Sequence, residues 1–152
     1  MTTGNQPLKI LFLCTGNSCR SQMAEGWARQ LFPGIFEAYS AGTAPQALDP
    51  RAVKVMAEVG VDISKHRAKA FAELRDQDFD LAVTVCDQAR ENCPAYFGRA
   101  QKLHQSFDDP PYLAKNVKDE EAALAHYRKV RDQIRAFVQT LPDIIHSQEN
   151  VP

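Results

Sequence analysis

Cysteine spacing is the feature of this chain that most clearly indicates chemistry. Cys14 opens the run Cys-Thr-Gly-Asn-Ser-Cys-Arg, which is small and polar and ends at Arg20. When such a turn joins a strand to a helix, successive backbone N–H groups and the positive helix N-terminus can hold an oxyanion. Arg20 adds a guanidinium that can bind two oxygens of a tetrahedral anion. The run therefore predicts an oxyanion site with a nucleophilic thiolate at Cys14.

The residues of this loop have individual expected roles. Gly16 allows the backbone to bend, and Asn17 tolerates a left-handed conformation. Ser21 is placed to donate a hydrogen bond to the Cys14 thiolate, and Cys19 is most simply a small buried side chain. The expected oxyanion-binding residues are Thr15, Gly16, Asn17, Ser18, Cys19 and Arg20.

The same spacing of a cysteine and an arginine occurs a second time, from Cys93 to Arg99. This second copy follows a polar stretch, residues 87–92, whereas the first copy follows an apolar run. Its second residue, Pro94, lacks the N–H group that an oxyanion cradle needs. We therefore expect the oxyanion site in the first copy only.

Strand and helix patterns alternate along the chain, which predicts an α/β fold with a parallel sheet and helices on both faces. Short apolar runs predict strands, and longer amphipathic segments bounded by helix stop signals predict helices. The expected strands are 8–13, 35–40, 80–85 and 100–104, the expected helices are 21–32, 49–59 and 119–141, and residues 105–118 are expected to form a loop.

Two cysteines are expected at the same edge of this sheet. Ligands bind at the carboxyl ends of the strands in such sheets. Cys14 follows the first predicted strand and Cys86 follows the third. The pattern therefore indicates that these two thiols meet.

Composition sets the broad class of the protein. A length of 152 residues fits a single domain over 1–152, with 1–7 and 143–152 expected to fray. Eighteen basic and 19 acidic residues give a net charge of -1, which argues against a nucleic-acid binder. No apolar run approaches the roughly 20 residues that span a bilayer, and the polar N-terminus does not resemble a secretory signal. We expect a cytoplasmic monomer with no metal, since no cysteine pair has zinc-ligand spacing.

Residues 13–26, which read Leu-Cys-Thr-Gly-Asn-Ser-Cys-Arg-Ser-Gln-Met-Ala-Glu-Gly, resemble the signature of thioredoxin-coupled arsenate reductases. These enzymes are built on the low-molecular-weight protein tyrosine phosphatase fold. The resemblance implies a four-stranded parallel sheet flanked by helices, with flavodoxin-like layering. It also implies reduction of arsenate to arsenite in arsenic detoxification, without an organic cofactor. The similarity continues through residues 39–42, 61–64, 80–94 and 107–110.

The resemblance also implies a general acid that protonates the leaving oxygen. Asp109, immediately before Pro110, takes this role by analogy, and Asp108 is the alternative. An Asp-Pro pair is also common where a loop simply begins to turn. On sequence alone, the pair therefore has a catalytic reading and a purely structural one.

A relay of three thiols is the further implication of the resemblance. Cys86 attacks the Cys14 adduct and leaves a Cys14–Cys86 disulfide, and Cys93 then exchanges to give Cys86–Cys93, which thioredoxin reduces. If residues 86–93 were helical, about 10 Å would separate the two Cα atoms. A disulfide needs about 4.4–6.8 Å, so this segment is expected to unwind on oxidation.

Two other functions stay open at this point. A low-molecular-weight phosphotyrosine phosphatase shares the loop and the acid but needs no further thiols, and weak aryl phosphatase activity is expected in either case. A non-catalytic oxyanion or redox sensor would bind without turnover. The sequence also does not choose between thioredoxin, glutaredoxin with glutathione, and another thiol as the reductant.

A cation site is a separate question that the resemblance raises. Asn17, Glu25 and Ser40 match positions that help to bind potassium in some relatives, but Lys69 stands where a further carboxylate is expected. An ammonium there competes with a cation. We therefore expect no specific dependence on potassium.

Overall fold

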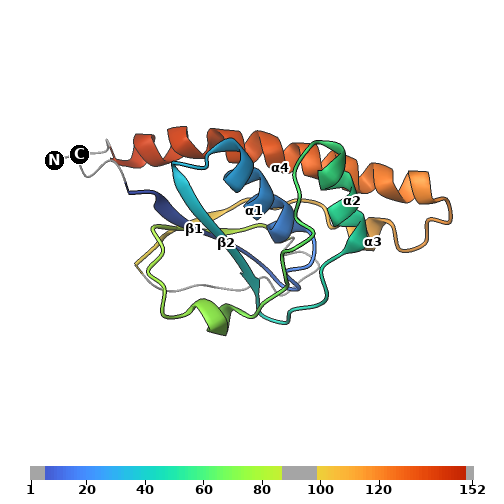
Figure 1. The fold of residues 1–152 in the computed structure, drawn as a ribbon, viewed down its shortest axis with the longest axis horizontal. Helices are drawn as coiled ribbons and strands as arrows, with labels where there is room; N and C mark the ends of the chain where they lie inside the picture. The colour runs from blue at the N-terminus through green and yellow to red at the C-terminus, as the bar shows by residue number, and fades with distance from the viewer. Residues whose placement is uncertain (1–5, 87–98, 150–152) are drawn as a thin grey trace.

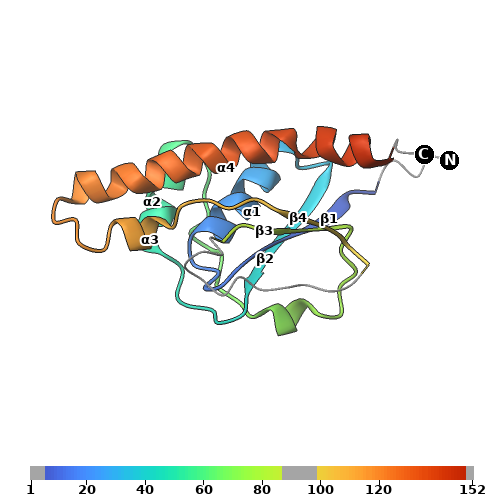
Figure 2. The same ribbon diagram turned by 180° about the vertical axis from the view of Figure 1, so that it is seen from behind.

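The structure of the chain is a computed structural model that describes residues 6–86 and 99–149, with side chains up to Ile145. Its centre is a four-stranded parallel sheet with the strand order β2-β1-β3-β4. Strands β1 and β2 are labelled in Figure 1, and β3 and β4 in Figure 2. The predicted parallel sheet is confirmed, and each strand lies within two residues of its expected position. The strands are β1 (Leu8–Cys14), β2 (Phe36–Gly42), β3 (Leu81–Thr84) and β4 (Gln101–His104).

Helical segments flank this sheet, as expected, but they are distributed unequally between its two faces within the described residues. On one face, α1 (Arg20–Leu31) lies between the sheet and the long helix α4 (Glu120–Glu149), and α2 (Pro50–Glu58) packs beside α4 (Figures 1 and 2). On the other face, the helix within the described residues is a single 3-10 turn, η2 (Phe71–Leu74). The thick helical layer therefore lies on one side of the sheet.

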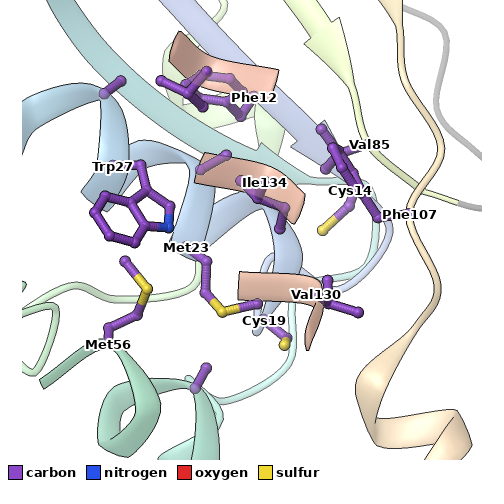
Figure 3. Packing of buried hydrophobic residues seen from close by; sticks show 14 of the residues in the cluster. Phe12, Cys14, Cys19, Met23, Trp27, Met56, Val85, Phe107, Val130 and Ile134 are labelled. Carbon is purple, nitrogen blue, oxygen red and sulfur yellow. The ribbon is translucent and has the colours of Figure 1, made fainter. Parts of the chain in front are cut away.

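Burial on both faces explains the nearly continuous apolar sequence of β1. Ile10, Phe12 and Cys14 point towards α1 and α4, where they join Met23, Trp27 and Ile134 in the main core (Figure 3). Leu11 and Leu13 point to the opposite face and pack in a second cluster with Phe79. This alternation places the Cys14 side chain on the face covered by the helices.

Helix α4 is longer than the sequence pattern predicts. Its expected end at Leu141 is wrong, because the helix continues through Pro142 to Glu149. Ile145 is buried four residues after Leu141 and extends the apolar stripe along the same face. Packing of this stripe outweighs the single backbone hydrogen bond that proline removes, so residues 143–149 are helical where a frayed end was expected.

A short helix also lies inside the segment that was expected to be a loop. Helix α3 (Pro110–Leu113) begins directly after Asp109, which is its N-cap residue. The sequence does contain a signal for it, because proline is favoured at the first position of a helix. The position of Asp109 is therefore set by the start of α3.

Candidate active site

The loop between β1 and α1 is held open by a second loop that follows β2. The N–H groups of Ala44, Gln46 and Asp49 donate to the carbonyls of loop residues Thr15, Gly16 and Ser18, at 2.9, 2.8 and 2.9 Å. These loop carbonyls therefore point away from the centre of the loop. An oxyanion cradle needs its N–H groups on the inner side of the loop, and outward-pointing carbonyls are compatible with that arrangement.

Gly42, at the end of β2, makes this arrangement possible. A Cβ atom at this position would lie 2.4 Å from the Thr15 carbonyl oxygen and 2.9 Å from that of Cys14. No side chain fits at these distances. In the sequence this glycine is recognisable only as part of a turn, because the close approach depends on two segments that are far apart in the chain.

The sulfur of Cys14 receives hydrogen bonds from inside the loop. The N–H of Asn17 donates to Cys14 Sγ at 3.3 Å, and Ser21 Oγ lies 2.9 Å from the same sulfur. Asn17 Nδ2 donates to Ser21 Oγ at 2.8 Å, so a lone pair of Ser21 is used there. The hydroxyl proton of Ser21 is therefore able to point at the sulfur, which agrees with the expected role of Ser21.

Asn17 has the unusual backbone conformation of this loop. Its φ is 49°, in the left-handed region that asparagine tolerates, and its side chain is fully buried. Gly16, where the bend was expected, has an ordinary φ and room for a side chain. The backbone bend is therefore at Asn17, and the buried side chain of Asn17 stabilises it.

Arg20 and Asp109 face each other across the site. Arg20 is 4% exposed, and its Nη1 donates to the Phe107 carbonyl at 3.1 Å. Its Nη2 lies 3.7 Å from Asp109 Oδ1. Asp108, the alternative acid, lines a different hollow against α4. The geometry therefore brings Asp109, not Asp108, to the site of Cys14.

These groups surround a pocket of about 140 Å³. All the expected oxyanion-binding residues line it except Asn17, which is buried behind the loop. Gln46 and Pro111 were not anticipated, because no local pattern connects them to the loop. The lining residues are Cys14, Thr15, Gly16, Ser18, Cys19, Arg20, Gln46, Asp109 and Pro111.

Cys86 follows the carboxyl end of β3, the strand that is paired with β1. Leu13 is paired with Thr84, and Val85 N donates to the Leu13 carbonyl at 3.0 Å (Figure 3 shows Val85 next to Cys14). Cys86 is fully buried in the same core cluster as Cys14. It is disulfide-bonded, whereas Cys14 and Cys19 are free thiols. Cys93, and the expected unwinding of residues 87–92, lie outside the described residues.

Comparison with known proteins shows which family the chain belongs to. The model of the low molecular weight phosphotyrosine protein phosphatase family matches residues 9–150. The chain belongs to this family. It is 42% identical to an arsenate reductase of Halalkalibacterium halodurans over 134 residues, which is 88% of this chain and 94% of the relative.

Solved structures of the family share the fold. An arsenate reductase in the oxidized state superposes with a TM-score of 0.69 at 29% identity, covering 88% of this chain and 95% of that one. A thioredoxin-dependent arsenate reductase of Corynebacterium glutamicum gives a TM-score of 0.69 at 20% identity, covering 96% of this chain and 65% of that chain. The second likeness shows the fold alone.

Cys19 and Cys14 belong to the same loop between β1 and α1, but their environments differ. Burial raises the pKa of the Cys19 thiol well above its usual value, and the negative charge of Asp49 raises it further. Cys19 therefore stays protonated at neutral pH. This favours the structural role that the sequence indicates.

The residues that were compared with a potassium site make hydrogen bonds and an ion pair with other protein groups. Glu25 accepts hydrogen bonds from Ser40 at 2.6 Å and from Arg29 at 2.7 Å. The backbone N–H of Lys69 donates to Asn17 Oδ1 at 2.9 Å, and its ammonium group donates to the Arg67 carbonyl at 3.2 Å.

Within the described residues there is no group of three acidic, histidine or cysteine side chains that could hold a metal ion. The same residues contain no helix long and apolar enough to cross a membrane.

Proposed function

We propose that this protein reduces arsenate to arsenite. The observation that carries the proposal is the position of Cys86, a buried cysteine at the end of the strand next to the one that ends at Cys14. A phosphatase hydrolyses its cysteine adduct with water and has no use for a second thiol. A reductase must deliver two electrons, and a pair of thiols supplies them when it forms a disulfide.

The first step forms a bond between sulfur and arsenic. The loop N–H groups and Arg20 hold the arsenate oxygens, and the Cys14 thiolate attacks arsenic(V). Asp109 gives its proton to the departing oxygen, which leaves as water. Arg20 lies 3.7 Å from Asp109, so the acid and the oxyanion-binding group act on the same pocket.

The second step reduces the arsenic. The Cys86 thiolate attacks Cys14 Sγ, the sulfur–arsenic bond breaks, and its electron pair stays on arsenic, which leaves as arsenite. A Cys14–Cys86 disulfide remains. Cys93 then attacks Cys86, releases the Cys14 thiolate and leaves Cys86–Cys93. A dithiol reductant takes over this disulfide, so each arsenate consumes two electrons and yields one water.

In the proposed relay Cys14 ends each turnover as a free thiol, and Cys14 is a free thiol in the structure. As reductant we propose thioredoxin, in a monomeric cytoplasmic enzyme, because residues 13–26 resemble the signature of thioredoxin-coupled arsenate reductases.

Phosphate-ester hydrolysis is the second candidate and is expected as a weak side activity. Tetrahedral phosphate has nearly the same shape as arsenate, so the loop and Asp109 suit both. None of the described residues that line the pocket is aromatic.

A coupled assay tests the proposal. NADPH consumption is followed with thioredoxin, thioredoxin reductase and arsenate, for the wild type and for Cys86→Ser and Cys93→Ser. The wild type is expected to turn over, and both variants are expected to lose multiple turnover while still hydrolysing p-nitrophenyl phosphate. Turnover in Cys93→Ser would remove this residue from the relay. Absence of arsenate reduction by the wild type with any dithiol reductant would reject the proposal.

A further inference from the structure

Gln22, in the first turn of α1, is fully buried beneath the active-site loop although its side chain is polar. Its Nε2 donates to the carbonyl and to the Oδ1 of Asn17, at 3.0 and 3.1 Å. It also donates to the Arg67 carbonyl at 3.0 Å. The Oε1 atom lies 3.0 Å from Nδ1 of His66. Gln22 therefore connects the loop to the segment 66–69 that follows α2.

The orientation of this amide is fixed by its partners. The two N–H bonds of the Gln22 amide point at three oxygens. One proton is therefore shared between the carbonyl oxygen and Oδ1 of Asn17, and the other is donated to the Arg67 carbonyl. The reversed amide would place Oε1 against three acceptors. Since Oε1 must face His66, the imidazole donates from Nδ1.

The orientation of Gln22 determines that of Asn17. Asn17 Oδ1 faces two donors, Gln22 Nε2 and the N–H of Lys69. Asn17 Nδ2 therefore faces Ser21 and donates to its hydroxyl. Gln22 also anchors the segment that supplies the Lys69 N–H, so both supports of the Asn17 amide depend on it.

We propose that Gln22 is a positioning residue for the nucleophile: it fixes the Asn17 amide, and thereby directs the Ser21 hydroxyl proton to the sulfur of Cys14. This rests on the proposed function only in taking Cys14 as the nucleophile. Gln22 bonds to Asn17, and its influence on Cys14 passes from there through Ser21. A hydrogen bond to an anionic sulfur favours the thiolate.

The test measures the thiolate directly and needs no arsenate. The full-length reduced protein is treated with iodoacetamide over a range of pH, and modification of Cys14 is followed by peptide mass. The charged and titratable groups around Cys14 are Arg20, Asp109, Cys19 and Cys86, and none of them is altered.

Two substitutions remove different parts of the link. Gln22→Met keeps the length and loses the hydrogen bonds, and Gln22→Asn keeps the amide but is one methylene too short. Each is expected to move the midpoint of the Cys14 modification profile upward by about one pH unit. The matched control is Gln30→Met, an exposed position on the same helix, which should leave the midpoint unchanged.

A double-substitution cycle separates positioning from general loosening of the loop. If Gln22 acts through Ser21, Gln22→Met should cause little further shift in a Ser21→Ala background. Full additivity of the two shifts would overturn the proposal, and so would an unshifted midpoint in both Gln22 variants. The result for Gln22 stands apart from the coupled assay, because the modification rate does not depend on whether arsenate is reduced.

Steady-state kinetics give a second readout. At pH values below the midpoint of the modification profile, Gln22→Met should lower kcat for arsenate by about 10-fold and leave KM within about 2-fold, because the thiolate population changes and the oxyanion cradle does not. A rise in KM with an unchanged kcat would instead make Gln22 part of the binding loop's support, and would contradict its role as a positioning residue for Cys14.

Discussion

Ser21 Oγ lies 2.9 Å from Cys14 Sγ and is itself the acceptor of a hydrogen bond from Asn17 at 2.8 Å. Ser21 uses a lone pair to accept that bond, so its single proton is able to point at the sulfur. A hydrogen bond of this kind stabilises an anionic sulfur. The side of the sulfur that faces the pocket remains available to attack the oxyanion.

Removal of this hydroxyl is the first prediction. Ser21→Ala should lower kcat at neutral pH by about 10- to 100-fold, because a hydrogen bond to a charged group contributes about 1.5–3 kcal/mol. Thr140→Ala, at an exposed position on α4, is the control. A kcat of Ser21→Ala equal to that of the wild type would contradict this explanation.

The close approach of Gly42 to the loop gives a prediction about stability. Gly42→Ala must push apart the Thr15 and Cys14 carbonyls or the strand, and should destabilise the protein by about 1–3 kcal/mol. Gly34→Ala is the matched control, because a Cβ atom at Gly34 would have no heavy atom within 4 Å. Urea unfolding of the two variants compares them. Equal stabilities would show that the loop does not need this contact.

Cys86 is anchored by the segment that also holds Arg20. Ser106 Oγ donates to the Cys86 carbonyl at 3.2 Å, and the next residue, Phe107, accepts from Arg20. Ser106→Ala should slow arsenate reduction about 5-fold, the equivalent of about 1 kcal/mol for one hydrogen bond. Hydrolysis of p-nitrophenyl phosphate should be unchanged, because it uses no Cys86.

Ser64→Ala, at an exposed position away from the pocket, is the control for this substitution. Rapid-quench measurement of the Cys14–Cys86 disulfide identifies the slowed step. If both activities of Ser106→Ala fell by the same factor, Ser106 would support the pocket as a whole and not Cys86.

Alkaline pH should weaken the fold through Cys19. Its pKa is raised well above the usual value of 9.0 by burial and by Asp49. The unfolded chain therefore loses this proton at a lower pH than the folded chain does, so stability falls as the pH rises above 9.0. Cys19→Ala should lose less stability than the wild type over the same alkaline range, which urea unfolding at neutral and alkaline pH measures. An equal loss in both proteins would assign the effect to another group.

Local patterns were enough to predict the elements that carry the chemistry. The apolar run before Cys14, the small polar loop and the following helix are contiguous in sequence, and the structure places them as expected. The position of Cys14 and Cys86 at the carboxyl ends of two neighbouring strands followed from the pattern of a parallel sheet. The general acid needed the resemblance, and only the structure separates Asp109 from Asp108.

What sequence reasoning missed depends on contacts between distant segments. Gln46 reaches the pocket through its hydrogen bond to Gly16, and the role of Gln22 becomes visible only when residues 66–69 lie against the loop. From sequence alone, Gly42 is recognisable only as part of a turn, because its close approach to the loop also joins two distant segments. The end of α4 was misjudged because Pro142 is a strong local stop signal, and the burial of Ile145 outweighs it.

A single-turnover experiment tests the three-thiol relay most directly. The fully reduced protein is mixed with arsenate in the absence of any reductant, and arsenite, free thiols and disulfide pairs are measured. We expect one arsenite per protein, the loss of two thiols, and a Cys86–Cys93 disulfide with Cys14 free again; Cys93→Ser should stop at Cys14–Cys86. Formation of arsenite without loss of the Cys86 thiol, or no arsenite from a protein that still binds arsenate, would contradict the relay.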